Sequence, residues 1–193
     1  MRLFMYSVGL WFQRRPKQIL RLAGWRVAPG LPGGGGSIGV WGRKRSALRG
    51  IRIARAKGLP LVTIEDAFLR SVRTGREGEA GLGIVADRQG ISFDADGQSD
   101  LFDLIEQADS FDGKLMAEAR LELAKMRYRR LSKYNAFDDD LSGLPKGFVL
   151  VIDQASRDAS ITLGGASDAD FHKLLQAAQG ENPGKTILIT AHP

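Results

Sequence analysis

A short apolar strand that runs directly into a loop of polar side chains most restricts how this 193-residue chain can fold. Residues 148–152 are all apolar, and the next eight residues, DQASRDAS, contain Asp153, Asp158 and Ser160. Other segments repeat this order of apolar strand, polar residues and helix, which is typical of an α/β fold. Ligands of open α/β sheets bind beyond the carboxyl ends of the strands, so this loop is the first place to expect a reacting group.

The charge is unevenly distributed along the chain. All 22 acidic residues follow position 57, whereas 13 of the 28 Lys and Arg residues lie in residues 1–57. A strongly positive first third predicts an anionic partner, such as phospholipid headgroups, nucleic acid or an acidic glycan.

Residues 10–27 mix Trp, Leu and Ile with Arg and Lys, which predicts a basic helix that begins at Pro16. Such a helix suits peripheral contact with an anionic membrane. A helix packed on the domain, with its Arg heads in water, is the other interpretation. The segment has no motif that reads bases, so no nucleic-acid partner is expected.

The composition limits the compartment and the chemistry. Without cysteine the chain forms neither disulfides nor thiolate metal sites, which fits a reducing compartment. No apolar run is long enough to span a bilayer. Residues 3–12 resemble the hydrophobic part of a signal peptide but lack a cleavage site, so we expect a cytoplasmic protein. No residues recur with metal-ligand spacing, and no metal is expected.

Two stretches rich in glycine or proline divide the chain. The four glycines at 33–36 indicate a linker, because a phosphate-binding loop would follow a strand and open a helix. The sequence LPKG at 144–147 marks a second boundary. We expect a basic segment with its linker at 1–36, an α/β region at 37–144 and a second α/β region at 145–193. Two strands and one helix make half a nucleotide-binding domain, so the second region is expected to be incomplete.

Hydrophobic periodicity and capping residues predict the main elements. The longest helix, at 113–131, has an apolar stripe that we expect to pack into the core. Ser99 is expected to cap a shorter helix at 100–108, and the segments 83–86 and 91–93 are expected to form a β-hairpin. Further strands are expected at 38–41, 61–64, 148–152 and 186–190, and further helices at 47–57 and 168–179.

Parallel strand pairs bring polar residues to common edges of a sheet. A helix connects the strands at 38–41 and 61–64, so we expect a parallel pair with Arg43, Glu65 and Asp66 at one edge. For each of these three residues, an ion pair or a helix cap is the simpler role.

The strands at 148–152 and 186–190 would likewise bring Asp158 and His192 to one edge. A carboxylate there can act as nucleophile, general base or electrostatic stabiliser, and a neutral His suits phosphate recognition or proton transfer. The chain has no Gly-x-Ser-x-Gly, Walker, complete Gly-x-Gly-x-x-Gly or His-Glu-x-x-His motif. Serine hydrolase, ATPase, dinucleotide oxidoreductase and zinc protease activities are therefore not expected.

Seven sequence blocks occur in order between residues 40 and 193: VWGRK-x-SA, LPLVTIEDAFLRSV, LSKYN, VIDQ-x-x-x-DASI, GGA, ENPG and HP. Together they resemble the KpsC (LipA) family of capsule polysaccharide proteins. The resemblance implies a GT-B-like architecture of two Rossmann-type lobes, with 37–144 as the acceptor-side lobe and 145–193 as the start of a truncated donor-binding lobe. It also implies a retaining glycosyltransferase of capsular polysaccharide biosynthesis, which transfers β-Kdo from CMP-Kdo to a lysophosphatidylglycerol-linked acceptor.

The same resemblance implies roles for individual residues, a nucleotide-sugar donor and a glycolipid acceptor as partners, no cofactor, and a peripheral position at the inner membrane. By position, Asp158 is the candidate for the nucleophile. The donor side contains Gln154, Ser160, His192 and Pro193, and the acceptor side contains Arg43, Glu65 and Asp66. The alternative function is a non-catalytic α/β domain that binds an anionic membrane or glycan through its basic first third.

Overall fold

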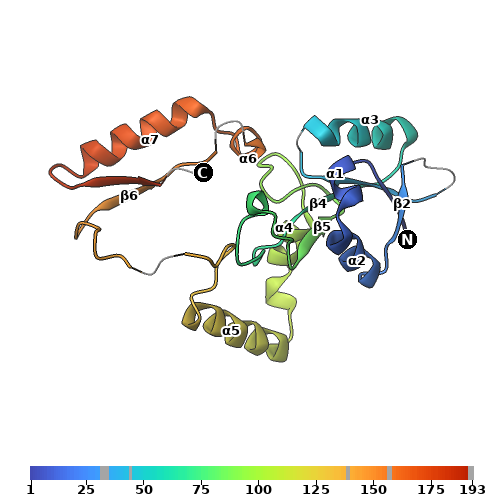
Figure 1. Cartoon of the computed structure of the whole chain (residues 1–193), viewed down its shortest axis with the longest axis horizontal. Coiled ribbons are helices and arrows are strands. Elements are labelled where there is room, and N and C mark those ends of the chain that lie inside the picture. Colours follow the sequence, from blue (N-terminus) through green and yellow to red (C-terminus); the bar gives the residue numbers. More distant parts are fainter. Residues whose placement is uncertain (31–34, 44, 138–139, 156–157, 191–193) are drawn as a thin grey trace. The chain divides into compact units, whose positions relative to one another are not determined.

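The computed structural model describes residues 1–30, 35–43, 45–137, 140–155 and 158–190. The chain forms two compact units. Unit 1 comprises Met1–Ser92 and Gly97–Phe137, and unit 2 comprises Phe93–Asp96 and Asp138–Pro193. Both units combine strands with helices (Figure 1), so the expected α/β class is confirmed.

Unit 1 is built on a five-stranded sheet. Its strands are β1 (Arg2–Met5), β2 (Arg26–Pro29), β3 (Ser37–Trp41), β4 (Leu61–Asp66) and β5 (Ile84–Asp87). Their spatial order is β2-β1-β3-β4-β5, with β1 to β4 parallel and β5 antiparallel to β4. The direction of winding reverses between β1 and β3, which is the topological switch point of an open α/β sheet.

Helices cover both faces of this sheet. They are α1 (Val8–Phe12), α2 (Arg14–Leu22) and α3 (Leu48–Lys57). Successive residues of a strand point to opposite faces, so Leu3 packs in one buried cluster with Leu20 of α2, and Phe4 packs in a second one with Ala54 of α3. Figure 1 shows α2 and α3 on opposite sides of the strands. Unit 1 therefore has three layers, with apolar strands buried on both faces.

The basic first segment is part of this sheet. Its strands β1 and β2 were not predicted, and β1 pairs with both β2 and β3. The predicted helix is present but begins at Arg14 rather than Pro16. Because Pro16 and Leu20 are buried, α2 packs on the domain by one face.

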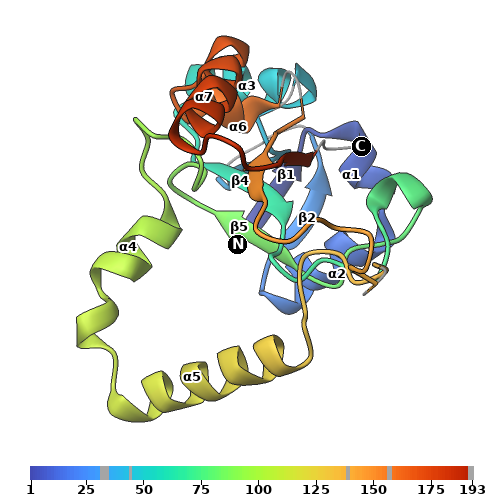
Figure 2. The ribbon, with the colours of Figure 1, turned by 90° about the vertical axis from the view of Figure 1, so that its left-hand side faces the viewer.

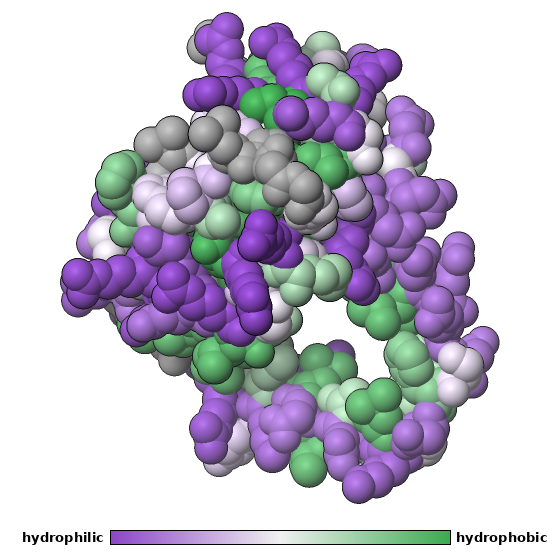
Figure 3. Space-filling view, turned by 90° about the vertical axis from the view of Figure 1, so that its right-hand side faces the viewer, coloured by the Kyte–Doolittle hydropathy of each residue, from purple (hydrophilic) through white to green (hydrophobic). Residues whose placement is uncertain are grey.

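The helices α4 (Asp100–Glu106) and α5 (Gly113–Tyr128) form an arm that extends away from the sheet of unit 1 (Figure 2). Ser99 caps α4 as predicted, since its Oγ accepts a hydrogen bond from the Phe102 N–H at 3.1 Å. The prediction that α5 packs into the core is wrong, because none of its residues is buried and Leu115 is 47% exposed. The spacing of apolar residues predicts that one face of a helix is apolar, but it does not show whether another element of the chain covers that face. Figure 3 shows hydrophobic side chains at the surface of this arm, in the lower part of the view.

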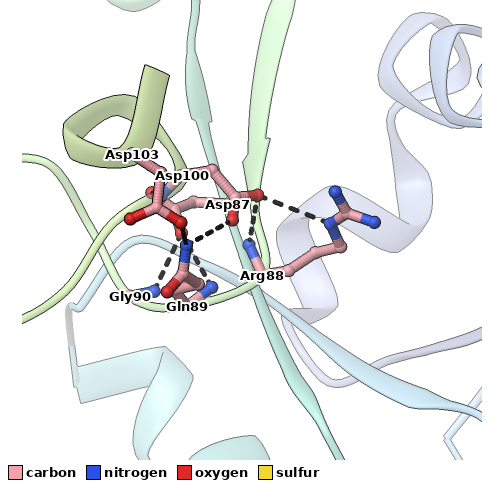
Figure 4. A network of polar contacts seen from close by, with 6 residues as sticks. All are labelled: Asp87, Arg88, Gln89, Gly90, Asp100 and Asp103. Carbon is pink, nitrogen blue, oxygen red and sulfur yellow. Dashed lines mark hydrogen bonds and ion pairs between the residues drawn. The ribbon is translucent and has the colours of Figure 1, made fainter. Parts of the chain in front are cut away.

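The predicted hairpin is wrong in its second strand. β5 pairs with β4 instead, and residues 91–93 form no strand. Asp87 is 4% exposed, and its carboxylate stabilises the turn that follows β5 (Figure 4). Its Oδ1 accepts hydrogen bonds from the N–H groups of Gln89 at 2.9 Å and Gly90 at 2.8 Å, and its Oδ2 accepts one from the Asp100 N–H at 3.1 Å. The end of β5 is thereby tied to the start of α4.

Asp100 extends this network. Its carboxylate accepts hydrogen bonds from the Arg88 N–H at 3.0 Å and from Nε2 of Gln89 at 3.2 Å. Burial raises the pKa of Asp100, but these hydrogen bonds and the nearby Arg88 guanidinium lower it by more, so the pKa lies below its usual value. Asp100 is therefore a stable anion that accepts hydrogen bonds at neutral pH.

Unit 2 contains two parallel strands joined by helices. Its elements are β6 (Val149–Ile152), α6 (Ala159–Leu163), α7 (Asp168–Glu181) and β7 (Ile187–Thr190). The strands predicted at 148–152 and 186–190 and the helix predicted at 168–179 are confirmed to within two residues. Ile152 pairs with Thr190, so both strands end at the same edge of the sheet.

Candidate functional site

A pocket of about 380 Å³ lies in unit 2, at the carboxyl end of β6. Three segments line it: residues 152–154 after β6, Ile161 of α6, and seven residues between positions 166 and 174 at the start of α7. This is the position at which ligands bind in open α/β sheets, beyond the strand ends.

Two residues predicted for the donor side, Gln154 and Ser160, form one connected group with the predicted nucleophile, Asp158, beside this pocket. Nε2 of Gln154, which lines the pocket, lies 3.3 Å from Oγ of Ser160. The Ser160 N–H donates a hydrogen bond to Oδ1 of Asp158 at 2.9 Å, and Asp158 is the N-cap of α6. The carboxylate of Asp158 is therefore oriented by the same residue that contacts Gln154. The other two donor-side predictions, His192 and Pro193, lie outside the described residues.

Two lining residues, Asp170 and His172, were missed by sequence reasoning. The ring of His172 packs edge-on against Phe171 with the centroids 6.3 Å apart, and its Nδ1 lies 3.2 Å from the Asp168 carbonyl oxygen. The sequence signal for this part of the pocket is the capping box of Ser167 and Asp170, which marks the start of α7.

The carboxylate of Asp170 stays ionised across the physiological pH range. A hydrogen bond from Lys173 at 2.8 Å and hydrogen bonds from the side chain and backbone of Ser167 lower the pKa of Asp170 to about 2. Since a group with so low a pKa exchanges no proton near neutral pH, Asp170 acts as a fixed negative charge and a helix cap in the pocket wall.

The residues predicted for the acceptor side lie at one edge of the unit 1 sheet. Trp41 of β3 pairs with Ile64 of β4, so Arg43 follows the end of β3 at the same edge at which Glu65 and Asp66 form the last two residues of the adjacent parallel strand β4. Asp66 takes the simpler of its two predicted roles, because its Oδ1 lies 3.0 Å from Nε of Arg70 in an ion pair.

Glu65 and Arg43 are held close to the backbone at this edge. The Glu65 carboxylate approaches Cα of Gly42 so closely that any side chain there would collide with it, and Gly42 has a φ of +55°. The Nε of Arg43 is buried and has no hydrogen-bond partner among the described residues. In the part of the chain that the structure describes, no group of three or more His, Cys, Asp or Glu residues has the arrangement of a metal site.

Comparison with known proteins adds sequence relatives. The family described as Capsule polysaccharide biosynthesis protein matches residues 37–135 and 114–193. The capsule polysaccharide modification protein LipA of Neisseria meningitidis serogroup A is 34% identical over 159 residues, which cover 79% of this chain and 23% of LipA. The lipopolysaccharide-processing protein LpsZ of Rhizobium meliloti is 34% identical over 140 residues, which cover 70% of this chain and 32% of LpsZ. The chain thus spans about a quarter to a third of these curated relatives.

Two solved structures from Thermosulfurimonas dismutans are similar over the whole chain. The first, KpsC, beta Kdo 2,4 transferase, is 30% identical with a TM-score of 0.82, and the match covers 60% of that chain. The second, KpsC, beta Kdo 2,7 transferase, is 24% identical with a TM-score of 0.69 over 62% of that chain, and so bears on the fold alone. The expected GT-B-like α/β fold is confirmed by this similarity.

Proposed function

This chain belongs to the capsule polysaccharide biosynthesis protein family, and on that premise we propose that it forms part of a retaining β-Kdo transferase that uses CMP-Kdo as donor. The 30% identity to a solved structure named as a β-Kdo transferase supports the sugar. The observation that carries the proposal is the connected group of Gln154, Ser160 and Asp158 beside the pocket of unit 2. A non-catalytic domain has no need of such a group at a strand end.

The chemistry proceeds by two displacements at the anomeric carbon of Kdo. Asp158 attacks this carbon, the bond to the phosphate oxygen breaks, and CMP leaves with the electron pair. A hydroxyl of the glycolipid acceptor, in the family pattern one linked to lysophosphatidylglycerol, then displaces the carboxylate and loses its proton, and two inversions give retention. CMP leaves as a stabilised phosphate anion, so the proposal invokes no metal and no cofactor.

Donor binding is the first test of this function. We expect calorimetry to detect binding of CMP-Kdo to the chain, and Gln154→Ala to weaken it by about 5-fold, because a hydrogen bond to the donor is worth roughly 1 kcal/mol. Gln179→Ala, the same change on an exposed part of α7 outside the pocket, is the matched control and should leave the affinity unchanged. Absence of CMP-Kdo binding, or an equal loss in both variants, would contradict the proposal.

We place the enzyme at the cytoplasmic side of the inner membrane, in peripheral contact through the exposed side of α2. No helix in the described parts of the chain is both long and apolar enough to cross a bilayer. Phe12, the last residue of α1, and Leu22, the last residue of α2, are 76% and 89% exposed. Four exposed arginines lie near them in the sequence, in a segment without acidic residues, namely Arg14, Arg15, Arg21 and Arg26. Apolar side chains flanked by cations are the pattern that binds anionic lipid surfaces.

Vesicle flotation tests this contact. The chain should bind anionic vesicles more tightly than neutral ones, and Phe12→Ser with Leu22→Ser should weaken binding by about 10-fold or more, because each buried apolar side chain contributes more than 1 kcal/mol. The matched control is Phe137→Ser with Leu141→Ser, which removes another exposed Phe and Leu from a site next to three aspartates. This control should leave vesicle binding unchanged. Equal flotation of wild type and the Phe12 and Leu22 variant would rule out this surface as the membrane contact.

A further inference from the structure

A second pocket, of about 410 Å³, lies wholly within unit 1, and three of its nine lining residues are arginines. Arg14 and Arg15 of α2 line one wall, and Arg70 lines another. The only carboxylate among the lining residues is that of Glu79. We propose that this pocket binds a phosphate or carboxylate group, for which the planar guanidinium offers paired hydrogen bonds.

Arg70 is fixed in place before any ligand arrives. Its side chain is 11% exposed and pairs through Nε with Asp66 at 3.0 Å. Its Nη1 donates to Oγ of Ser71 at 2.8 Å and to the Glu79 carbonyl oxygen at 3.0 Å. None of these contacts uses Nη2, which lies toward Gly75, itself a lining residue. A side chain at Gly75 would collide with this nitrogen, so the glycine keeps that edge of the guanidinium accessible to the pocket.

The acidic residues of the neighbouring loop accept hydrogen bonds from other residues of that loop. Oε2 of Glu79 accepts a hydrogen bond from the Arg73 N–H at 2.5 Å. Oε2 of Glu77 accepts hydrogen bonds from the backbone and the hydroxyl of Thr74, both at 2.8 Å, and these bonds lower the pKa of Glu77. Both carboxylates stay negatively charged, but Arg14, Arg15 and Arg70 outnumber Glu79 among the lining residues, so the pocket keeps an excess of positive charge toward an entering anion.

Arg14 and Arg15 lie at the N-terminus of α2, whose helix dipole adds to the positive potential in the pocket. The first turn of α2 contains no acidic residue, and Gln13 makes no side-chain capping hydrogen bond there. The partial positive charge of the helix N-terminus is thus added to that of the guanidinium groups. Nη1 of Arg15 contacts the Ala80 carbonyl oxygen at 3.4 Å, which connects the two walls across 65 residues of sequence.

The anion is assigned to the acceptor, and this step rests on the proposed function. Arg70 is bound to Asp66, one of the residues expected on the acceptor side, so the pocket adjoins that edge of the sheet. An acceptor linked to lysophosphatidylglycerol presents a phosphate, and one that already carries Kdo presents the carboxylate of a sugar acid. Both groups have the same hydrogen-bonding chemistry with arginine, so the experiment must distinguish them.

The test is a titration followed by NMR at low ionic strength, with shifts read at the amides of Gly75 and Gly78. Inorganic phosphate, glycerol phosphate and free Kdo are the probes. Arg14→Gln with Arg15→Gln should weaken binding at these amides by about 10-fold or more, because two charge-assisted contacts are lost. Arg52→Gln with Arg55→Gln removes the same charge from exposed positions of α3 outside the pocket and should change the affinity by less than about 2-fold.

The probes and variants separate the outcomes. Tighter binding of glycerol phosphate assigns the pocket to a lipid phosphate, and tighter binding of free Kdo assigns it to the sugar carboxylate. Equal weakening by both double variants, or no shift with any probe, overturns the proposal. If the wild type binds these anions but not CMP-Kdo, the proposed function fails while the pocket stands. If it binds CMP-Kdo but no anion at these amides, the pocket fails alone.

Discussion

Replacing Asp158 by asparagine is expected to lower the rate of Kdo transfer by a factor on the order of 10³ or more, while unit 2 stays folded. An amide cannot form the glycosyl ester on which the double displacement depends. Its side-chain oxygen can still accept the hydrogen bond that Oδ1 takes from the Ser160 N–H at 2.9 Å, and Asn is as good an N-cap as Asp. The measurement is the transfer rate of the complete protein of which this chain forms part, with CMP-Kdo and a glycolipid acceptor, beside the thermal unfolding of each variant.

The control for this substitution is a second capping aspartate. Asp112 caps α5 through a hydrogen bond from the Leu115 N–H at 2.8 Å, in the same manner as Asp158 caps α6. Asp112→Asn should therefore keep the full transfer rate. A normal rate in Asp158→Asn would mean that its carboxylate serves only as a helix cap and that the nucleophile lies elsewhere.

The sequence identified the elements whose local signals are strong. β3, α3 and β4 form a strand–helix–strand unit in which α3 ends at Gly58, a C-cap in the left-handed conformation with a φ of +59°. β6, α7 and β7 show the same local signals. β1 was missed because it is four residues long, and the apolar residues after Ser7 make the whole of residues 3–12 resemble the hydrophobic part of a signal peptide. It is a strand because it pairs with partners that begin 24 and 34 residues further along the chain, information that no local pattern contains.

The unit 2 pocket could be predicted from local sequence, whereas the basic pocket of unit 1 could not. Gln154, Asp158 and Ser160 lie within seven residues, so their position after an apolar strand was enough to predict that they lie together. The basic pocket joins Arg15 to a loop near Ala80, and only the packing of α2 against the sheet brings these segments together. The apolar stripe of α5 shows the opposite limit, because a periodic pattern describes a helix face but not what covers it.

Asp87 provides the largest expected loss of stability. Asp87→Ala should lower the free energy of unfolding by about 3 kcal/mol, because the N–H groups of Gln89, Gly90 and Asp100 each lose an acceptor, and a net hydrogen bond is worth roughly 1 kcal/mol. Urea denaturation measures this as a lower midpoint at unchanged slope. Asp109→Ala, an exposed aspartate in the same unit, should cost less than about 0.5 kcal/mol. If both variants were equally stable, the turn after β5 would hold without its buried carboxylate, and the network in Figure 4 would be a consequence of the fold rather than one of its supports.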